Sequence, residues 1–156
     1  MSRKPTKQRY ILPDPKFNDE MVAKFINCLM MEGKKSLASA IFYNAVDEIS
    51  IQTGEPGIEV WKRGLENVTP NLDVKRRKVG GSTVQVPEEV RPKRKITLSI
   101  RWIIQAARSR KEKTMKDRLV NEIIAASKGE GSAVKKKMDM HKTAESHKAN
   151  SHIRLR

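Results

Sequence analysis

The amino-acid sequence predicts a mainly α-helical, single-domain protein over residues 1–156: a bundle of about six helices with one β-hairpin protruding between the third and the fourth. Three observations support this fold class. Apolar residues recur at the three- and four-residue spacing of a helix in six segments. Two runs containing β-branched residues flank a Gly-Gly dipeptide, which is typical of a tight hairpin turn. The length of 156 residues is that of one domain.

Three helices are predicted before the hairpin. Residues suited to begin them are Asn18, Ser36 and the pair Pro56-Gly57, and residues suited to follow their ends are Gly33, Gly54 and Pro70. The stripes that should face the core are Val22, Phe25, Ile26, Leu29 and Met30 in the first helix, Ala38, Ile41, Phe42, Ala45 and Ile49 in the second, and Ile58, Trp61 and Leu65 in the third. We expect these helices to share one core.

The hairpin is predicted over residues 72–90, with Gly80-Gly81 at its turn because glycine tolerates the positive φ angles of such a turn. A fourth helix should begin near Pro92, since proline is well tolerated at the first helical position. Its buried stripe is Ile96, Ile100, Ile103 and Ala107, while Arg94, Arg101 and Arg108 share a different face.

Two further helices are predicted after the basic region. The stretch from Thr114 to Asp117 resembles a capping box for a fifth helix, with Leu119 and Ile123 facing inward. Gly129 and Gly131 mark a loop, and Ser132 is placed to cap a sixth helix. The sixth helix is weakly amphipathic, with one face formed by Val134, Met138 and His141.

Basic residues are concentrated in three segments. The chain holds 33 Lys and Arg against 18 Asp and Glu, a formal net charge of +15. Residues 75–110 carry a net charge of +9, residues 1–16 carry +4 and residues 135–156 carry +5, whereas residues 17–74 carry −4. Basic arms and one basic face on a domain that is otherwise acidic to neutral indicate a nucleic-acid binder.

The candidate RNA-binding side chains come from a basic N-terminal arm (residues 1–17), the hairpin, the predicted fourth helix and the neighbouring loops; a further basic tail covers residues 150–156. The candidates are Arg3, Lys4, Lys7, Arg9, Lys34, Lys35, Lys75, Arg76, Arg77, Lys78, Arg91, Lys93, Arg94, Lys95, Arg101, Arg108, Arg110 and Lys113. Lysines act as point charges on phosphates, and arginines can clamp a phosphate with two hydrogen bonds. Because only 4% of the residues are aromatic, recognition of shape and phosphates is favoured over base stacking.

Catalytic and metal-dependent functions are disfavoured. The stretch Gly33-Lys34-Lys35-Ser36 lacks the earlier glycine of a phosphate-binding loop, because Cys28 stands in its place. The histidines His141, His147 and His152 are spaced six and five apart, so RNA contact or solvent exposure suits them better than a metal site. No convergent set of nucleophile, base and metal ligands is visible, and we therefore expect no enzyme activity and no cofactor.

Two classes of nucleic-acid binder remain. The favoured one is a structural RNA-binding protein, because the densest charge lies on and beside a hairpin. The rival is a free-standing binder, such as an RNA chaperone or a helix-turn-helix regulator that would bind as a dimer. The lone Cys28 excludes an intramolecular disulfide. The sequence contains no run of about 20 apolar residues and therefore predicts no membrane span.

Six short segments are informative when they are taken together. They are Ile11-Leu12-Pro13-Asp14-Pro15-Lys16-Phe17, Glu32-Gly33-Lys34-Lys35-Ser36, Leu65-Glu66-Asn67-Val68-Thr69-Pro70, Val79-Gly80-Gly81-Ser82-Thr83-Val84-Gln85-Val86-Pro87, Arg91-Pro92 and Arg101-Trp102-Ile103-Ile104-Gln105-Ala106-Ala107-Arg108. In this order and spacing, from about Lys7 to Asn150, the chain resembles the small-ribosomal-subunit protein seven family of the bacterial or organellar type. It departs from the family at Val84 and over residues 151–156, where the family often has aromatic residues, so contacts there are not carried over.

The resemblance implies a structural constituent of the small ribosomal subunit that supports translation without catalysis. It implies binding to the 3′ major domain of small-subunit ribosomal RNA (rRNA) and nucleation of the subunit head. It also implies that the hairpin tip, Gly80, Gly81 and Ser82, lies near the messenger RNA (mRNA) path and the exit-site transfer RNA (tRNA). Small-subunit proteins nine and eleven are the implied neighbours, in a cytoplasmic ribosome or in one of an organellar stroma or matrix.

Overall fold

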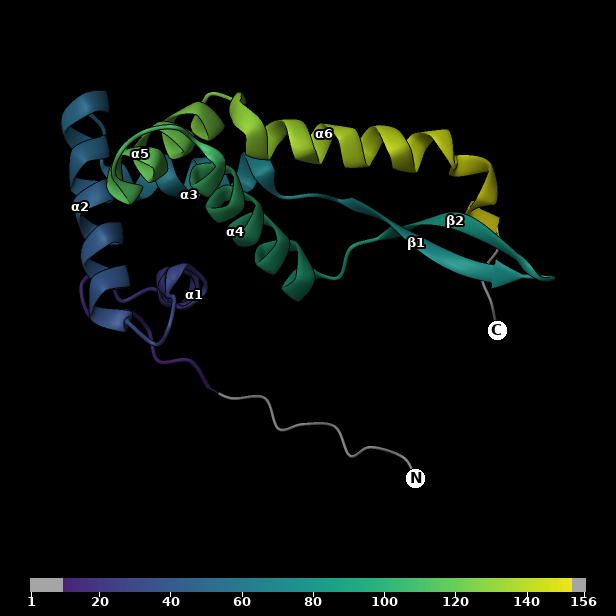
Figure 1. Cartoon of the computed structure of the whole chain (residues 1–156), viewed down its shortest axis with the longest axis horizontal. Coiled ribbons are helices and arrows are strands. Elements are labelled where there is room, and N and C mark those ends of the chain that lie inside the picture. The colour runs from purple at the N-terminus through teal and green to yellow at the C-terminus, as the bar shows by residue number, and fades with distance from the viewer. Residues whose placement is uncertain (1–9, 153–156) are drawn as a thin grey trace.

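The computed structural model describes residues 10–152, which form six α-helices, one two-stranded antiparallel sheet and a short 3-10 helix (Figure 1). The bounds are α1 Glu20–Leu29, α2 Lys35–Thr53, α3 Gly57–Val68, β1 Leu72–Val79, β2 Ser82–Glu89, α4 Pro92–Ser109, α5 Met115–Ser127, α6 Gly131–Ser146 and η1 Lys148–His152. This order confirms the predicted fold class, with the hairpin between α3 and α4. Within the described residues, no helix is long and apolar enough to span a bilayer.

Helix α5 lies at the centre of the bundle, where it packs against α2, α3, α4 and α6. Its inward residues Leu119, Val120, Ile123 and Ala126 are at most 1% exposed. Fully burying a Leu, Ile or Val side chain stabilises the fold by about 1.5–3 kcal/mol. The position of α5 therefore fixes how the four surrounding helices are oriented.

A cluster of three aromatic rings joins the first three helices. Phe25 of α1, Phe42 of α2 and Trp61 of α3 are all fully buried, and their ring centroids lie 5.2–5.6 Å apart in tilted or edge-to-face pairs. Such pairs contribute about 0.5–1.5 kcal/mol beyond the burial of their area. The cluster confirms that the apolar stripes predicted for these helices meet in one core.

The junction between α2 and α3 requires a residue without a side chain. A Cβ atom at Gly57 would lie 2.1 Å from the carbonyl oxygen of Val46, far inside van der Waals contact. The backbone N–H of Gly57 also donates to Ser50 Oγ at 2.8 Å, which holds the first turn of α3 against α2. The preceding stop signal is confirmed as well, because Gly54 ends α2 in the left-handed conformation with φ of 72°.

The hairpin has the predicted turn. Gly80 and Gly81 have φ angles of 56° and 89°, the left-handed values of a two-residue turn, and Val79 pairs with Ser82 on either side of them. The register continues without a break to the pair of Leu72 and Glu89. The two strands are therefore aligned over their full length, and opposing residues share one face of the ribbon.

The hairpin and α6 extend from the bundle in the same direction (Figure 1). Helix α6 contacts both strands, and η1 packs on β2. Two side chains make the connection: His141 Nε2 accepts a 3.0 Å hydrogen bond from the N–H of Asn71, and Asn150 Nδ2 donates to the carbonyl oxygen of Gln85 at 3.1 Å. The C-terminal elements therefore support the hairpin along its length, which the sequence did not predict.

Three predicted helix starts are displaced by one or two residues. Asn18 lies outside α1 with φ of 50°, and Asp19 caps the helix by accepting from the N–H of Met21 at 2.7 Å. Ser36 lies inside the first turn of α2, whose N-cap position is held by Lys34. Ser132 likewise lies inside α6, because the side chain of Glu122 on α5 accepts from the N–H of Ala133 at 3.0 Å and takes the capping role.

The other predictions of helix starts and faces have mixed outcomes. Pro92 is the first residue of α4, and Thr114 Oγ1 caps α5 by accepting from the N–H of Asp117 at 3.1 Å, both as predicted. Met138 was expected on the same face as the buried Val134, yet it is 61% exposed. The buried residues of α6 are Ala133, Val134 and Ala144, so its inward face is centred away from Met138, which lies at the edge of that face and is turned to solvent.

We predict that Ile103→Asp unfolds the domain, because Ile103 is fully buried and an unpaired carboxylate there costs several kcal/mol, of order 3–5. Urea unfolding followed by circular dichroism measures the change. The matched control is Ile51→Asp on α2, since Ile51 is 78% exposed and the same substitution should change stability by less than about 0.5 kcal/mol. Wild-type stability of the Ile103 variant would contradict the packing described for α4.

Candidate nucleic-acid interface

The two faces of the hairpin differ in how their cations are paired. Lys75 and Arg77 share one face, where Glu88 Oε2 lies 2.5 Å from Lys75 Nζ and 3.7 Å from Arg77 Nη2. The hydrogen bond from Lys75 lowers the pKa of Glu88, with further help from the charges of Arg77 and Arg91. Glu88 therefore remains ionised at neutral pH and offsets part of the positive charge on this face.

The opposite face of the hairpin carries Arg76 and Lys78, which stand across from Gln85 and Thr83 in the register. Both cations are exposed. Within the part of the chain that the structure describes, neither makes an ion pair or a side-chain hydrogen bond. Of the four consecutive cations Lys75 to Lys78, Arg76 and Lys78 are therefore the two whose charge is not offset by a neighbouring carboxylate.

Two basic residues of α4 tie the helix to the base of the hairpin. Arg94 Nη2 lies 2.9 Å from Asp73 Oδ2, and the Asp73 side chain is only 13% exposed. Lys95 Nζ donates to Asn71 Oδ1 at 3.1 Å and lies 3.6 Å from Glu89. These contacts hold β1 and β2 against the start of α4, so Arg94 and Lys95 have a positioning role as well as a charge.

The remaining cations of α4, and Arg91 just before it, lie on the outer surface. Arg91, Lys93, Arg101 and Arg108 are exposed. Arg108 Nη2 donates to the carbonyl oxygen of Leu29 at 3.2 Å, which links the end of α4 to the end of α1. The expected common face of Arg94, Arg101 and Arg108 therefore runs from the hairpin base to the loop after α1.

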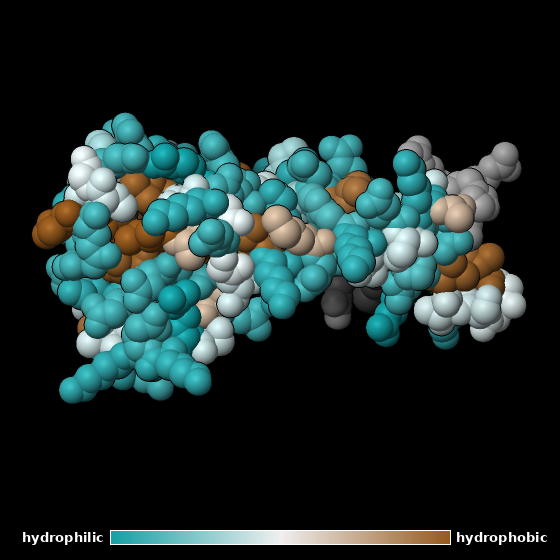
Figure 2. All heavy atoms as spheres, turned by 90° about the horizontal axis from the view of Figure 1, so that it is seen from above, coloured by the Kyte–Doolittle hydropathy of each residue, from teal (hydrophilic) through white to brown (hydrophobic). Residues whose placement is uncertain are grey.

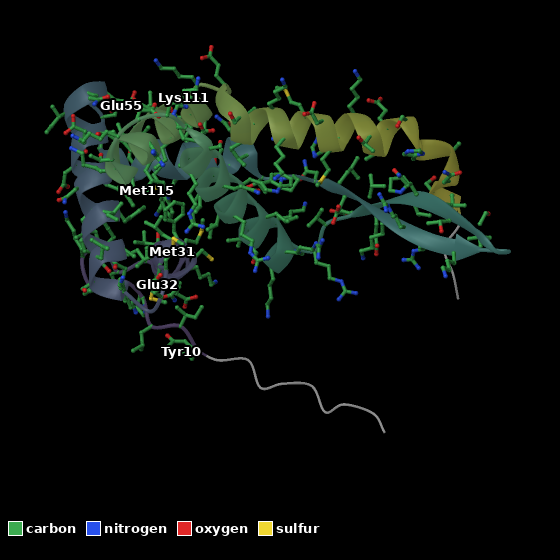
Figure 3. All side chains as sticks on the ribbon, viewed as in Figure 1. Tyr10, Met31, Glu32, Glu55, Lys111 and Met115 are labelled. Carbon is green, nitrogen blue, oxygen red and sulfur yellow. The ribbon has the colours of Figure 1, made fainter. Side chains whose placement is uncertain are left out.

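That loop and the start of α5 carry the last group of candidates. Lys34, Lys35 and Lys113 are exposed, and Lys34 pairs with Glu32 at 2.7 Å. A groove of about 440 Å³ lies between the loop after α1 and the start of α5. It is lined by Leu29, Met31, Glu32, Lys34, Leu37, Ala38, Ile41, Arg108, Met115 and Arg118. Figure 3 shows Met31, Glu32 and Met115 at this end of the bundle, where Arg118 is a cation that the sequence analysis did not select.

Arg110 is built into a network of the protein itself. Its Nη1 lies 2.9 Å from Glu122 Oε2, and its Nε lies 2.9 Å from Glu112 Oε1. The Glu122 side chain is fully buried, and Asn121 Nδ2 donates to Glu112 Oε1 at 2.9 Å. Arg110 is the counter-charge of a buried carboxylate, which leaves less of its guanidinium available to a phosphate than the exposed arginines have.

The described part of the predicted N-terminal arm is fixed where it meets the bundle. Asp14 is 4% exposed and accepts hydrogen bonds from the N–H groups of Lys16 and Phe17 and, at 2.6 Å, from the hydroxyl of Tyr43. Burial and this hydrogen bond raise the pKa of Tyr43 to about 12. Lys16 also pairs with Asp47 at 3.1 Å. The candidates Arg3, Lys4, Lys7 and Arg9 lie outside the described residues.

Two histidine positions can be compared with the sequence expectation. His141 was assigned to RNA contact or solvent, but it is a structural acceptor for the N–H of Asn71. Burial, together with the charge of Lys137, lowers the pKa of His141, which favours the neutral ring that this hydrogen bond needs. His152 ends η1, and residues 150–152 of the predicted tail lie in this short helix. Among the described residues, no group of three or more His, Cys, Asp or Glu could hold a metal ion.

Comparisons with known proteins identify the family of the chain. The family model described as ribosomal protein S7p/S5e matches residues 1–148. The chain belongs to this family. It is 58% identical over 155 residues to the small ribosomal subunit protein uS7 of Cytophaga hutchinsonii, covering 99% of this chain and 100% of that protein. It is 59% identical over 149 residues to the protein of the same name from Amoebophilus asiaticus, with 96% of each chain covered.

Membership of the S7p/S5e family confirms the resemblance found in the sequence, and it makes the chain a structural, non-enzymatic ribosomal component. The similarity covers the hairpin, α4 and the supporting helix α6 together. Figure 2 shows that hydrophilic residues cover most of this face, with hydrophobic atoms gathered mainly over the bundle and a smaller group at the opposite end.

We predict that Arg110→Ala lowers the free energy of unfolding by about 3 kcal/mol, because it leaves the buried carboxylate of Glu122 without its counter-charge. Lys111→Ala, an exposed change at the next position, should cost less than about 0.5 kcal/mol. Urea unfolding of both variants gives the comparison. Unchanged stability of the Arg110 variant together with weakened RNA binding would instead make Arg110 a direct RNA contact.

The same network predicts a pH dependence. The hydrogen bond from Arg110, followed by hydrogen bonds from the backbone and Asn121, lowers the pKa of Glu112 from its ordinary 4.5 to about 2. Because the folded-state pKa is lowered, the stabilisation is fully present above pH 4.5 and is lost as the pH falls from 4.5 towards 2. Glu112→Gln should flatten the dependence of unfolding free energy on pH in this window. Glu66→Gln, which removes an exposed carboxylate from α3, is the control, and identical curves for wild type and Glu112→Gln would refute the assignment.

Proposed function

We propose that the chain is a single RNA-binding domain of the small ribosomal subunit, which binds small-subunit rRNA through the outward cations of the hairpin and α4. Family membership and the printed names of the relatives support assembly into this subunit. The observation that carries the RNA-binding surface is the exposed pair Arg76 and Lys78 on one hairpin face, together with the exposed Arg101 and Arg108 on α4. Such a surface is complementary to the negatively charged phosphates of RNA.

The proposed mechanism is electrostatic and geometric. The bundle holds α4 and the hairpin in a fixed relation through Asp73, Asn71 and His141. Cations on two rigid elements can neutralise phosphates on two RNA segments at once, and so hold a multi-helix junction together. With this geometry the domain would organise the 3′ major domain of small-subunit rRNA and nucleate the subunit head.

The finer placement rests on the family resemblance. The hairpin tip, Gly80, Gly81 and Ser82, would lie near the mRNA path and the exit-site tRNA, and small-subunit proteins nine and eleven would be neighbours. The basic N-terminal arm would add contacts to RNA. The ribosome concerned would be that of the cytoplasm, or of an organellar stroma or matrix.

The salt dependence of RNA binding tests the proposal. We predict that Arg76→Ala/Lys78→Ala lowers the slope of log K against log salt by about 2, because two phosphate contacts are lost. Lys75→Ala/Arg77→Ala removes the same formal charge but should lower the slope less, since Glu88 already offsets these cations. Filter binding to an rRNA fragment of the 3′ major domain provides the measurement.

The matched design separates position from net charge, because both double variants lose two positive charges from the same strand. Equal slopes for the two variants would show that pairing with Glu88 does not reduce the contribution of Lys75 and Arg77 to RNA binding. A wild-type slope for Arg76→Ala/Lys78→Ala would remove that face of the hairpin from the interface. Circular dichroism spectra of the variants must match the wild type for either result to be interpreted.

A further inference from the structure

A second groove, of about 330 Å³, opens between α1 and the first half of α4. Its lining combines apolar residues with a polar rim: Ile11, Cys28, Ile96 and Ile100 on the one hand, and Lys24, Asn27, Lys93 and Thr97 on the other. It lies on the element that carries Arg94 and Arg101, beside the chain segment that leads from the N-terminal arm. The groove therefore lies on the cationic side of the molecule. Its apolar floor is a feature that phosphate binding alone does not require.

The rim has the charge of a site for a polyanion. None of the lining residues is acidic, and two are lysines. The ion pair of Lys24 with Glu20 is long, at 3.9 Å, and both side chains are substantially exposed. A loose exposed pair of this kind contributes little to stability, so Lys24 can turn to a phosphate at small cost.

Asn27 gives the groove a group that can read a base edge. Its side chain is exposed, and in the described part of the chain its amide makes no hydrogen bond. An amide offers a donor and an acceptor side by side, which is the pattern that matches the edge of an adenine. On the neighbouring helix, the hydroxyl of Thr97 already donates to the carbonyl oxygen of Lys93 at 3.0 Å, so Thr97 supplies shape more than hydrogen bonding.

We propose that this groove receives a single unstacked nucleobase of the bound RNA, with its face against Ile96 and Ile100, its edge at Asn27 and an adjacent phosphate at Lys24. The inference rests on the proposed function, because it assumes that the cationic surface binds RNA. A groove of this size is too small for an RNA helix, whereas splayed bases from loops and bulges are the parts of RNA that proteins read individually. Aliphatic side chains take the place of an aromatic platform, since none of the residues that line the groove is aromatic.

A groove-filling variant tests the proposal. Thr97 is exposed at the rim, so Thr97→Trp should occupy the groove without disturbing the core. We predict that it lowers affinity for the rRNA fragment about tenfold, the order of one base contact, and lowers the salt slope by about one at most, because only the phosphate at Lys24 can be displaced with the base. Asn44→Trp, at an exposed position of α2, is the control for adding the same side chain elsewhere and should bind as the wild type does.

Cys28 gives an independent readout of the groove, since it is the only cysteine of the chain and lines the site. Its rate of modification by a small thiol reagent should fall when the rRNA fragment is bound. A set of fragments that each carry one abasic nucleotide then tests whether the occupant is a base. At one position the abasic change should weaken binding to the wild type but not to Thr97→Trp.

The possible outcomes separate the two proposals. Wild-type affinity of Thr97→Trp with no protection of Cys28 overturns the groove site while leaving RNA binding intact. Weakened binding of Thr97→Trp with no such abasic position overturns the base as occupant and points to the RNA backbone or a polypeptide segment. Absence of salt-dependent binding by the wild type refutes the proposed function and, with it, the groove site.

Discussion

The buried carboxylate of Glu122 connects the helices on which the cationic surface depends. From the central helix α5, one oxygen pairs with Arg110 just after α4, and the other accepts from the N–H of Ala133 in the first turn of α6. Helix α4 carries much of the basic surface, and α6 supports the hairpin. A carboxylate in the protein interior is stable only when it is paired and hydrogen-bonded, so the two helix ends cannot move apart without exposing an uncompensated charge.

Pairing with carboxylates of the protein also determines which cations remain available to the proposed RNA partner. Arg94, Lys95, Lys75 and Arg110 each lie near a carboxylate of the protein, so the total of 33 Lys and Arg overstates the number of cations that are available to RNA. The pairs of Arg94 and Lys95 orient the hairpin relative to α4, while the exposed cations between them would supply the attraction in the proposed complex with RNA. Exposed ion pairs contribute little to stability on their own, and their role here is to fix direction.

The sequence predicted features that depend on near neighbours in the chain. The turn at Gly80-Gly81, the stop at Gly54 and the cap at Thr114 follow from local backbone preferences, and the apolar stripes follow from helical periodicity. The displaced starts at Ser36 and Ser132 show the limit of this reasoning. Ser132 fits a local capping rule, but the capping oxygen comes from Glu122, eleven residues before the N–H that it accepts. Only the tertiary packing reveals that partner.

For the candidate interface, too, the sequence predicted some features and could not predict others. The sequence could locate its positive charge, because a run such as Lys75 to Lys78 is visible without a fold. It could not assign the faces of the hairpin, since that requires the register and the position of Glu88. Nor could it bring Asn27 and Thr97 to one groove, because they lie on different helices. Charge is a property of composition, whereas selective recognition requires groups at fixed separations. In this chain those separations are set by the buried contacts of α5 and by the hydrogen bond between His141 and the start of the hairpin.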